Sequence, residues 1–292
     1  MKIQSILVLG VILTAQAARL TSPLFKIHNG ILVPTGKGSA SGSSSHGRIV
    51  GGGDAEMGSA PWMVSLQWGI VRPSHFCGGT IINPNWVLTA GHCVQAFPSY
   101  GIAVVIAGLH NLSEFGGTEQ VRHVTRSNMW SHEEFNDAEN YYSPHDIGLL
   151  VFQTPFAFDY FVNAIALPSP NEMHTGMATL HGWGSNSSSF YPTFPDILQT
   201  VDMPIIPIET CRSAWNLEPE LLHDNHICGG LLGGAVSACD LDRGGALTQN
   251  EEIVGIVSFG HFPCAQPDIP SVYVRVSAYI SWIEDTIDNV QL

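Results

Sequence analysis

The sequence predicts an all-β protein that ends in one helix. From residue 49 onward, short runs rich in β-branched and aromatic residues alternate with clusters of Gly, Pro, Asn and Ser. Frequent short strands joined by turns are typical of a β-sandwich or a β-barrel. We expect strands at Trp62–Trp68, Thr80–Leu88, Ile102–Ala107, Asp146–Phe152 and Ile253–Phe259.

The closing segment, residues 277–290, has a helical rather than a β period. Its apolar residues recur on one helix face, at Ile280, Trp282, Ile283 and Ile287. This spacing predicts one amphipathic terminal helix.

The N-terminal region divides into two segments. Residues 3–15 are apolar behind Lys2 and are followed by Ala15-Gln16-Ala17, the pattern of a secretory signal peptide that ends at Ala17. A membrane span is the alternative, but thirteen residues are fewer than the ~20 that a crossing helix needs. Residues 18–48 contain a Gly/Ser-rich run and are expected to form a flexible propeptide, so that the folded domain covers residues 49–292.

The charge is strongly divided along the chain. Of the 11 Lys and Arg residues, five lie in residues 1–48, which contain no Asp or Glu. The remaining six stand against 25 acidic residues, so residues 49–292 carry a formal charge of −19 and contain no lysine. This balance argues against nucleic acid or an anionic membrane as a partner and favours cationic proteins, although solubility alone would also explain it.

The cysteine count indicates disulfides. A secreted chain folds in an oxidising compartment, where an even number of cysteines can pair completely. Six cysteines permit 15 connectivities, and spacing alone leaves them open. A zinc site is the competitor, but the sequence has no C-x-x-C pair and we expect no metal there. The cysteines are Cys77, Cys93, Cys211, Cys228, Cys239 and Cys264.

Several motifs in one order make the sequence specific. The segment Thr89-Ala90-Gly91-His92-Cys93 resembles the surroundings of the catalytic histidine in trypsin-like serine proteases, and Asp146-Ile147-Gly148-Leu149-Leu150 resembles the segment of their aspartate. Both have glycine where alanine is usual. The motifs Arg48-Ile49-Val50-Gly51-Gly52, Cys77-Gly78-Gly79, Gly182-Trp183-Gly184 and Ser258-Phe259-Gly260 complete the pattern.

The resemblance covers residue 49 to about residue 285 and carries structural expectations. It implies two packed, six-stranded antiparallel β-barrels with an active site in the cleft between them. It also implies the pairs Cys77–Cys93, Cys211–Cys228 and Cys239–Cys264, and it assigns His92 and Asp146 to two of the three catalytic positions.

The third catalytic position departs from the family. The family's nucleophile lies in a G-D-S-G-G-P pattern, and the aligned stretch here is Leu241-Asp242-Arg243-Gly244-Gly245-Ala246. Arg243 stands at the serine position, and a guanidinium is a permanent cation that cannot act as a nucleophile. Leu241 stands where the family's glycine donates an N–H to the oxyanion hole, and we expect that donor to be turned away. The resemblance therefore implies a protein without protease activity.

Other parts of the family's machinery match. Cleavage after Arg48 would free the amine of Ile49, which in the family pairs with the aspartate that corresponds to Asp242. The specificity pocket would be formed by Ser237 at its base, with Gly260 and Ser271 in its walls. Ser271 replaces a wall glycine and Phe259 replaces the usual tryptophan, so we expect a narrowed pocket.

Three further sequence patterns carry less weight. Asn111 and Asn186 begin N-glycosylation sequons. The segment 108–120 resembles the family's calcium loop, but Leu109 and Gly116 stand where acidic ligands are expected and only Glu119 matches, so we expect no calcium. The nearby pair His223 and His226 is expected at the surface rather than in a metal site, and no cofactor is expected.

These observations favour a secreted, non-catalytic serine protease homologue that binds other proteins. Its expected partners are secreted proteins, including cationic proteins and components of a protease cascade. Its expected role is that of a cascade cofactor, an inhibitor decoy or an adhesive protein. An active secreted endopeptidase with a chymotrypsin-like pocket is the alternative. A protease inhibitor has no positive support in the sequence.

Overall fold

The computed structural model describes residues 25–28, 31–34, 51–136, 142–217, 221–234 and 236–290. The chain divides into two compact units, residues 1–41 and residues 42–292. The signal peptide proposed for residues 1–17 and the cleavage site at Arg48 and Ile49 lie outside the described residues.

The first unit contains a hairpin within the segment that we expected to lack regular structure. Strand β1 (Phe25–His28) pairs antiparallel with β2 (Ile31–Pro34), and the register places His28 opposite Ile31. The sequence between the two strands is Asn-Gly, a strong hairpin signal that our sequence analysis did not use.

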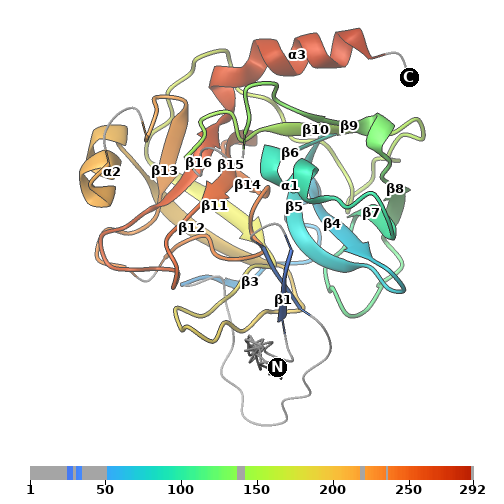
Figure 1. Ribbon diagram of the computed structural model, residues 1–292, viewed down its shortest axis with the longest axis horizontal. Helices are drawn as coiled ribbons and strands as arrows, with labels where there is room; N and C mark the ends of the chain where they lie inside the picture. Colours follow the sequence, from blue (N-terminus) through green and yellow to red (C-terminus); the bar gives the residue numbers. More distant parts are fainter. Residues whose placement is uncertain are drawn as a thin grey trace, which may run out of the picture. The chain divides into compact units, whose positions relative to one another are not determined.

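The second unit contains two antiparallel sheets (Figure 1). The first sheet has the order β8-β7-β4-β5-β6-β10-β9. Its strands are β4 (Met63–Gly69), β5 (Ser74–Asn83), β6 (Trp86–Thr89), β7 (Ile102–Ala107), β8 (Gln120–His123), β9 (Met129–Ser131) and β10 (Gly148–Val151).

The second sheet has the order β11-β14-β15-β16-β13-β12-β3, and β11 also pairs with β12. That pairing closes six strands into a barrel, to which β3 (Gly53–Asp54) is added at β12. The six strands are β11 (Met177–Gly182), β12 (Gln199–Ile206), β13 (His226–Gly229), β14 (Ala246–Gln249), β15 (Glu252–Phe259) and β16 (Ser271–Arg275).

The all-β, two-barrel fold class is confirmed, with a difference in detail. Each sheet has seven strands rather than six, because the short strands β9 and β3 extend them, and the first sheet forms a half-barrel. The strand expected over Thr80–Leu88 is two strands, because Pro84 and Asn85 form a turn in which the Asn85 N–H donates to Asn83 Oδ1 at 3.0 Å.

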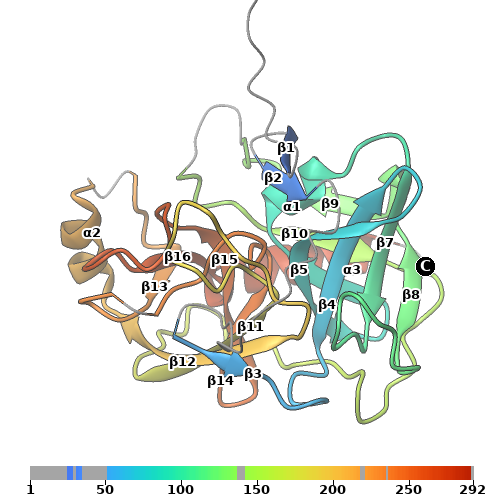
Figure 2. The same cartoon turned by 90° about the horizontal axis from the view of Figure 1, so that it is seen from below.

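Helices are few in the described residues. Helix α1 (Gly91–Ala96) packs beside β9 and β10, and α2 (Ile208–Trp215) lies at the opposite end of this unit from β8 (Figures 1 and 2). The C-terminal helix α3 (Ile280–Asn289) follows a 3₁₀ turn over Val276–Tyr279; a second 3₁₀ turn covers Arg126–Asn128. The terminal helix is confirmed, and it buries Ile280 and Ile283 as its apolar face.

The core and three disulfides hold the second unit together. Alternate residues of the closed barrel, such as Leu180, Met203 and Tyr273, are fully buried together inside it. The structure contains the disulfides Cys77–Cys93, Cys211–Cys228 and Cys239–Cys264, the pairing that the resemblance implied. Each such bridge stabilises a fold by about 2–4 kcal/mol.

Candidate functional site

A buried histidine–aspartate pair lies where the two sheets meet. His92 is the second residue of α1, and Asp146 lies two residues before β10. The Nδ1 atom of His92 lies 2.7 Å from Asp146 Oδ2, and the backbone N–H of His92 donates to Oδ1 at 2.8 Å. The two residues are 7% and 4% exposed. The carboxylate therefore fixes both the ring and the backbone of His92.

A serine completes the shell around the carboxylate. Ser258, in β15, donates its hydroxyl to Asp146 Oδ2 at 2.6 Å. Burial on its own would raise the pKa of Asp146, but the neighbouring His92 and the hydrogen bonds from His92 and Ser258 together lower it below its ordinary value. Asp146 is consequently an ionised hydrogen-bond acceptor at neutral pH.

Two glycines near the pair are explained by close packing. A Cβ atom on Gly91 would lie 2.9 Å from the Phe135 ring and 3.1 Å from the Ile147 carbonyl oxygen. On Gly148 a Cβ would lie 2.6 Å from Val94 Cγ2 and 2.9 Å from the Trp130 oxygen. These contacts leave no room for the alanines that the resemblance leads one to expect.

The outer nitrogen of His92 faces no hydroxyl among the described residues. Its nearest hydrogen-bonding atom there is Sγ of Cys93, at 3.4 Å, and that sulfur belongs to a disulfide. The hydroxyl of Ser258 is directed to Asp146, and that of Ser237 donates to the Ala238 oxygen at 2.6 Å. A serine general-base arrangement, in which imidazole accepts a hydroxyl proton, is not formed by these residues.

Arg243 lies close to the disulfide of Cys93, the residue that follows His92. Its carbonyl oxygen accepts a hydrogen bond of 2.8 Å from the Gly78 N–H, next to the Cys77–Cys93 disulfide. A Cβ atom on the following residue, Gly244, would lie 3.0 Å from Cys93 Sγ. The Arg243 side chain is partly exposed and forms no ion pair with a described residue.

Leu241 has a left-handed backbone conformation. Its φ angle is 75°, which a non-glycine residue adopts only at a cost of about 1–2 kcal/mol. The carbonyl oxygen of Leu241 contacts Nε2 of His75 at 3.0 Å. A glycine at this position would adopt the same φ angle. The replacement of glycine by leucine therefore does not by itself turn the N–H of residue 241 away from the direction expected for an oxyanion-hole donor.

His75 is a buried residue of this region that our sequence reasoning missed. Besides the Leu241 oxygen, its ring contacts the Ser65 hydroxyl at 2.8 Å and the Trp183 ring edge-on at a centroid distance of 5.4 Å. Burial lowers the pKa of His75 to about 4, although the hydrogen bond with Leu241 opposes that shift. Its position two residues before Cys77 was the one available signal.

Asp242 is held in a narrow, buried position. Its carboxylate accepts hydrogen bonds from the backbone N–H groups of Gly184, at 2.8 Å, and Cys239, at 2.9 Å. A Cβ on Gly184 would lie 2.2 Å from the carboxylate carbon and one on Gly182 would lie 2.1 Å from Oδ1. The Gly-Trp-Gly motif thus makes room for this carboxylate, whose pKa burial raises to about 7.

The residues expected around a specificity pocket come together. The hydroxyls of Ser237 and Ser271 lie 3.0 Å apart, and Ser271 Oγ also accepts from the Ala238 N–H at 3.0 Å. Both serines are almost completely buried. Gly260 lies nearby, since a Cβ on it would be 3.8 Å from Ser271 Oγ. The base of this region is therefore polar and uncharged.

The remaining predicted sites have local partners. In the loop that resembles a calcium site, the Glu119 carboxylate accepts from the N–H groups of Gly116 and Gly117, at 2.6 and 2.8 Å. The side-chain oxygen of Asn111 accepts from the Ser113 N–H at 2.8 Å, and that of Asn186 accepts from the Thr193 hydroxyl. Both asparagines are half-buried.

The expectation that His223 and His226 both lie at the surface is wrong for one of them. His223 is exposed, whereas His226 is 2% exposed. The His226 ring accepts from the His223 N–H at 3.1 Å, and burial lowers its pKa to about 4. His226 is thus a structural residue of β13.

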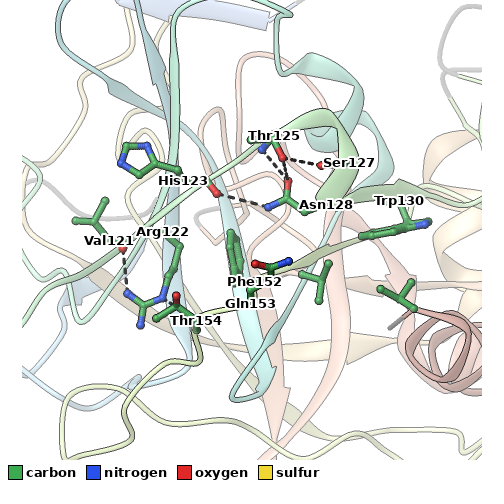
Figure 3. Close-up of a pocket in the computed structure, with 12 residues that line it drawn as sticks. Val121, Arg122, His123, Thr125, Ser127, Asn128, Trp130, Phe152, Gln153 and Thr154 are labelled. Carbon is green, nitrogen blue, oxygen red and sulfur yellow. Dashed lines mark hydrogen bonds between the residues drawn. The ribbon is translucent and has the colours of Figure 1, made fainter. Parts of the chain in front are cut away.

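A separate pocket of about 580 Å³ lies on the first sheet (Figure 3). It is lined by β8, by the 3₁₀ turn before β9 and by residues 151–154, and Arg122, Asn128 and Phe152 are among its side chains. Asn128 Nδ2 donates to the His123 oxygen at its rim. None of the residues predicted for the site lines this pocket.

The combination of two antiparallel sheets, a buried His–Asp–Ser258 cluster at their junction and three disulfides defines the scaffold of a serine endopeptidase. Comparison with known proteins agrees. Residues 49–283 match the family profile "Trypsin". The chain is 40% identical over 255 residues to Lectizyme of Glossina austeni. The alignment covers 83% of this chain and 88% of that protein.

Vertebrate relatives are also similar. The chain is 35% identical over 240 residues to Putative trypsin-6 of Homo sapiens and to Trypsin of Xenopus laevis, in each case over 82% of this chain. These alignments cover 90% and 91% of the two relatives. The chain belongs to the trypsin family.

Proposed function

We propose that this chain is a secreted, non-catalytic member of the trypsin family that acts by binding other proteins. The observation that carries the proposal is Arg243 at the position of the family's nucleophilic serine, immediately after Asp242 and before two glycines. A guanidinium has no oxygen to attack a peptide carbonyl, and loss of the nucleophile costs about 10⁶-fold in rate.

The surroundings of His92 support this proposal. No described hydroxyl lies within hydrogen-bond distance of its outer nitrogen, and the hydroxyls of Ser237 and Ser258 are engaged elsewhere. Rescue of catalysis by a neighbouring serine would require one of these groups to leave its partner. His92 and Asp146 then act as a structural pair, in which the carboxylate satisfies both the ring and the backbone of α1.

The acidic surface supports a cationic protein partner. Residues 49–292 carry only six arginines, and four of them are held by contacts within the fold, Arg126 by a hydrogen bond to the Phe97 oxygen at 3.1 Å. Arg212 pairs with Glu209 and Asp224, Arg122 binds the Thr154 and Pro155 oxygens, and Arg275 donates to the Asp224 oxygen. Most acidic residues therefore remain available to steer a basic partner.

Exposed aromatic residues indicate where such a partner could bind. Phe190 and Tyr191 are 72% and 87% exposed, and Phe262 is 43% exposed. The rings of Phe190 and Phe262 touch, with centroids 5.9 Å apart. Adjoining exposed aromatic side chains are a frequent feature of protein-binding surfaces. A role as cascade cofactor, inhibitor decoy or adhesive protein would use such a surface.

Secretion and proteolytic switching complete the proposal. The signal peptide at residues 1–17 and the three disulfides fit an oxidising, extracellular location, and no described helix is both apolar enough and long enough for a membrane crossing. Cleavage after Arg48 would free the Ile49 amine to pair with Asp242. That pair would order the loops around the cleft, so that cleavage controls binding rather than activity.

The alternative is an active secreted endopeptidase, and the names of the vertebrate relatives favour it. An organophosphonate that labels the active-site serine of serine proteases separates the two. We expect no labelling of the Arg48-cleaved protein, and labelling of its R243S variant and of an active trypsin as positive controls. Stoichiometric labelling of the unmutated protein would favour the endopeptidase.

A further inference from the structure

A second group of ligand-type side chains lies outside the His92 region. Glu172 and His174 come from the loop before β11, and Glu252 is the first residue of β15. The His174 Nε2 atom lies 3.9 Å from Glu172 Oε1 and 3.7 Å from Glu252 Oε2. One nitrogen and one oxygen from each carboxylate all lie within 4.8 Å of one another.

His174 is the unusual member of this group. Its side chain is only 6% exposed, yet neither Nδ1 nor Nε2 has a hydrogen-bond partner among the described residues. Burying a polar ring without partners costs about 1–3 kcal/mol. The two carboxylates are too far from Nε2 for direct hydrogen bonds, but they are on the side that Nε2 faces.

The fold positions Glu172 and holds together the two segments that carry this group. The Ser169 N–H donates to Glu172 Oε2 at 3.2 Å and leaves Oε1 toward His174, while the Glu172 carbonyl accepts from the Ser277 hydroxyl at 2.7 Å. Gln249 ties the hairpin end of β14 to this loop, because its Nε2 donates to the Thr175 and Met177 oxygens at 2.9 and 2.6 Å. The loop and the β14–β15 hairpin are thus fixed to each other independently of His174.

We propose that Glu172, His174 and Glu252 form a binding site for a divalent transition-metal ion, Zn²⁺ in particular. Zinc bonds of about 2.0–2.2 Å in tetrahedral geometry separate donor atoms by roughly 3.3–3.5 Å. The distances of 3.9 and 3.7 Å from His174 Nε2 to the two carboxylates therefore need to close by a few tenths of an ångström, and the two carboxylate oxygens, which lie within 4.8 Å of each other, need to approach as well. One imidazole and two carboxylates leave a fourth position for water. The two negative charges offset the charge of the ion.

The ligand set selects the kind of ion. Imidazole suits zinc, copper and nickel, whereas calcium and magnesium prefer oxygen ligands alone. All six cysteines are in disulfides, so no thiolate competes for zinc. Binding would link the loop before β11 to the start of β15 and would stabilise the native state by mass action.

Calorimetric titration of the purified, metal-free protein with ZnCl₂ at pH 7.5 tests the site. We expect one Zn²⁺ per chain with a dissociation constant on the order of 10⁻⁶ M, and no comparable heat with CaCl₂. The double variant E172Q/E252Q should weaken binding by at least about tenfold. The matched control E56Q/E284Q removes the same charge from two exposed positions and should stay within about twofold.

Histidines elsewhere in a chain also bind zinc weakly, so the comparison of E172Q/E252Q with E56Q/E284Q decides whether the proposed site exists. Unchanged affinity in E172Q/E252Q, or equal loss in both double variants, would overturn the proposal, as would the absence of binding to the unmutated protein. H174Q should also weaken binding by at least about tenfold; if it does not fold, E172Q/E252Q, at one exposed and one half-buried position, carries the test. Co²⁺ gives a second readout, since its visible absorption in the unmutated protein should be lost in E172Q/E252Q and kept in E56Q/E284Q.

Discussion

Nδ1 of His92 lies 2.7 Å from Oδ2 of Asp146, and the other ring nitrogen has no hydroxyl partner among the described residues. Asp146 thus orients the ring of His92 within a buried pair. A histidine–aspartate pair orients a general base, but a base without a nucleophile performs no acyl transfer.

The first prediction concerns restoration of the nucleophile. Arg243→Ser should make the Arg48-cleaved protein react with an organophosphonate, because the orienting carboxylate and the imidazole are already in place. Adding Leu241→Gly should change that rate by less than about tenfold, since residue 241 already has a positive φ. Rates of labelling for the two variants check this. A gain of about 10²–10³ from Leu241→Gly would mean that the leucine misdirects the oxyanion donor.

The second prediction concerns Asp242 and cleavage. Because the folded-state pKa of Asp242 is raised to about 7 from an ordinary value near 3.8, the native state binds a proton that the unfolded chain releases between those values. The contribution of Asp242 to the free energy of unfolding is fully present below about pH 4 and is lost as the pH rises toward 7. In the uncleavable R48Q protein, D242N should remove this slope, which is at most about 1.4 kcal/mol per pH unit.

Cleavage after Arg48 should change this pH dependence of the free energy of unfolding. If the Ile49 amine pairs with Asp242, the carboxylate stays ionised in the folded, cleaved protein. The free energy of unfolding of the cleaved protein should then not fall between pH 4 and 7 on account of Asp242. Denaturant unfolding of the cleaved and R48Q forms across this range measures the difference. Identical pH profiles would argue that the amine and Asp242 do not pair.

The third prediction concerns buried histidines. Burial lowers the pKa of His75, His181 and His226 to about 4, whereas an unfolded histidine titrates near 6.5. The unfolded chain therefore binds more protons in that window, so the free energy of unfolding should fall as the pH drops from 6.5 to 4. Together, the three histidines should change the free energy of unfolding with pH more than Asp242 does, whose contribution changes in the opposite direction. Equilibrium unfolding at four pH values checks the sign, and stability that rises on acidification would contradict it.

The fourth prediction concerns the glycines around Asp242. Gly184→Ala would place a Cβ 2.2 Å from the carboxylate carbon and should destabilise the protein by more than about 3 kcal/mol. Gly53→Ala is the matched control, because a Cβ there has no neighbour within 4 Å. It should change stability by less than about 1 kcal/mol. Thermal or denaturant unfolding compares the two, and equal effects would refute the packing argument.

The sequence predicted the second unit well because its motifs are local. The segments around His92 and Asp146 carry their own signature, and the resemblance then implied the barrels and the disulfides. Prediction from local sequence failed where a turn interrupts an apolar run, as at Pro84. It also failed in the first unit, where it did not predict strands β1 and β2. Neither error changes the site.

Long-range contacts were less accessible. Nothing in the spacing of His75 indicates that its ring contacts the oxygen of Leu241, because packing of β5 of the first sheet against the segment before β14 of the second sheet brings the two together. The proposed zinc ligands have the same character: Glu172 and Glu252 lie in distant parts of the sequence and meet only through the β11 and β14–β15 region. Such sites require tertiary structure.

The most direct measurement of the central claim is peptide turnover by the pure, Arg48-cleaved protein. A mixed peptide library incubated with it and analysed by mass spectrometry should yield no new termini above those of a H92A variant, whereas R243S should yield them. Cleavage by the unmutated protein that disappears in H92A would show that the chain is a working protease and would contradict the account.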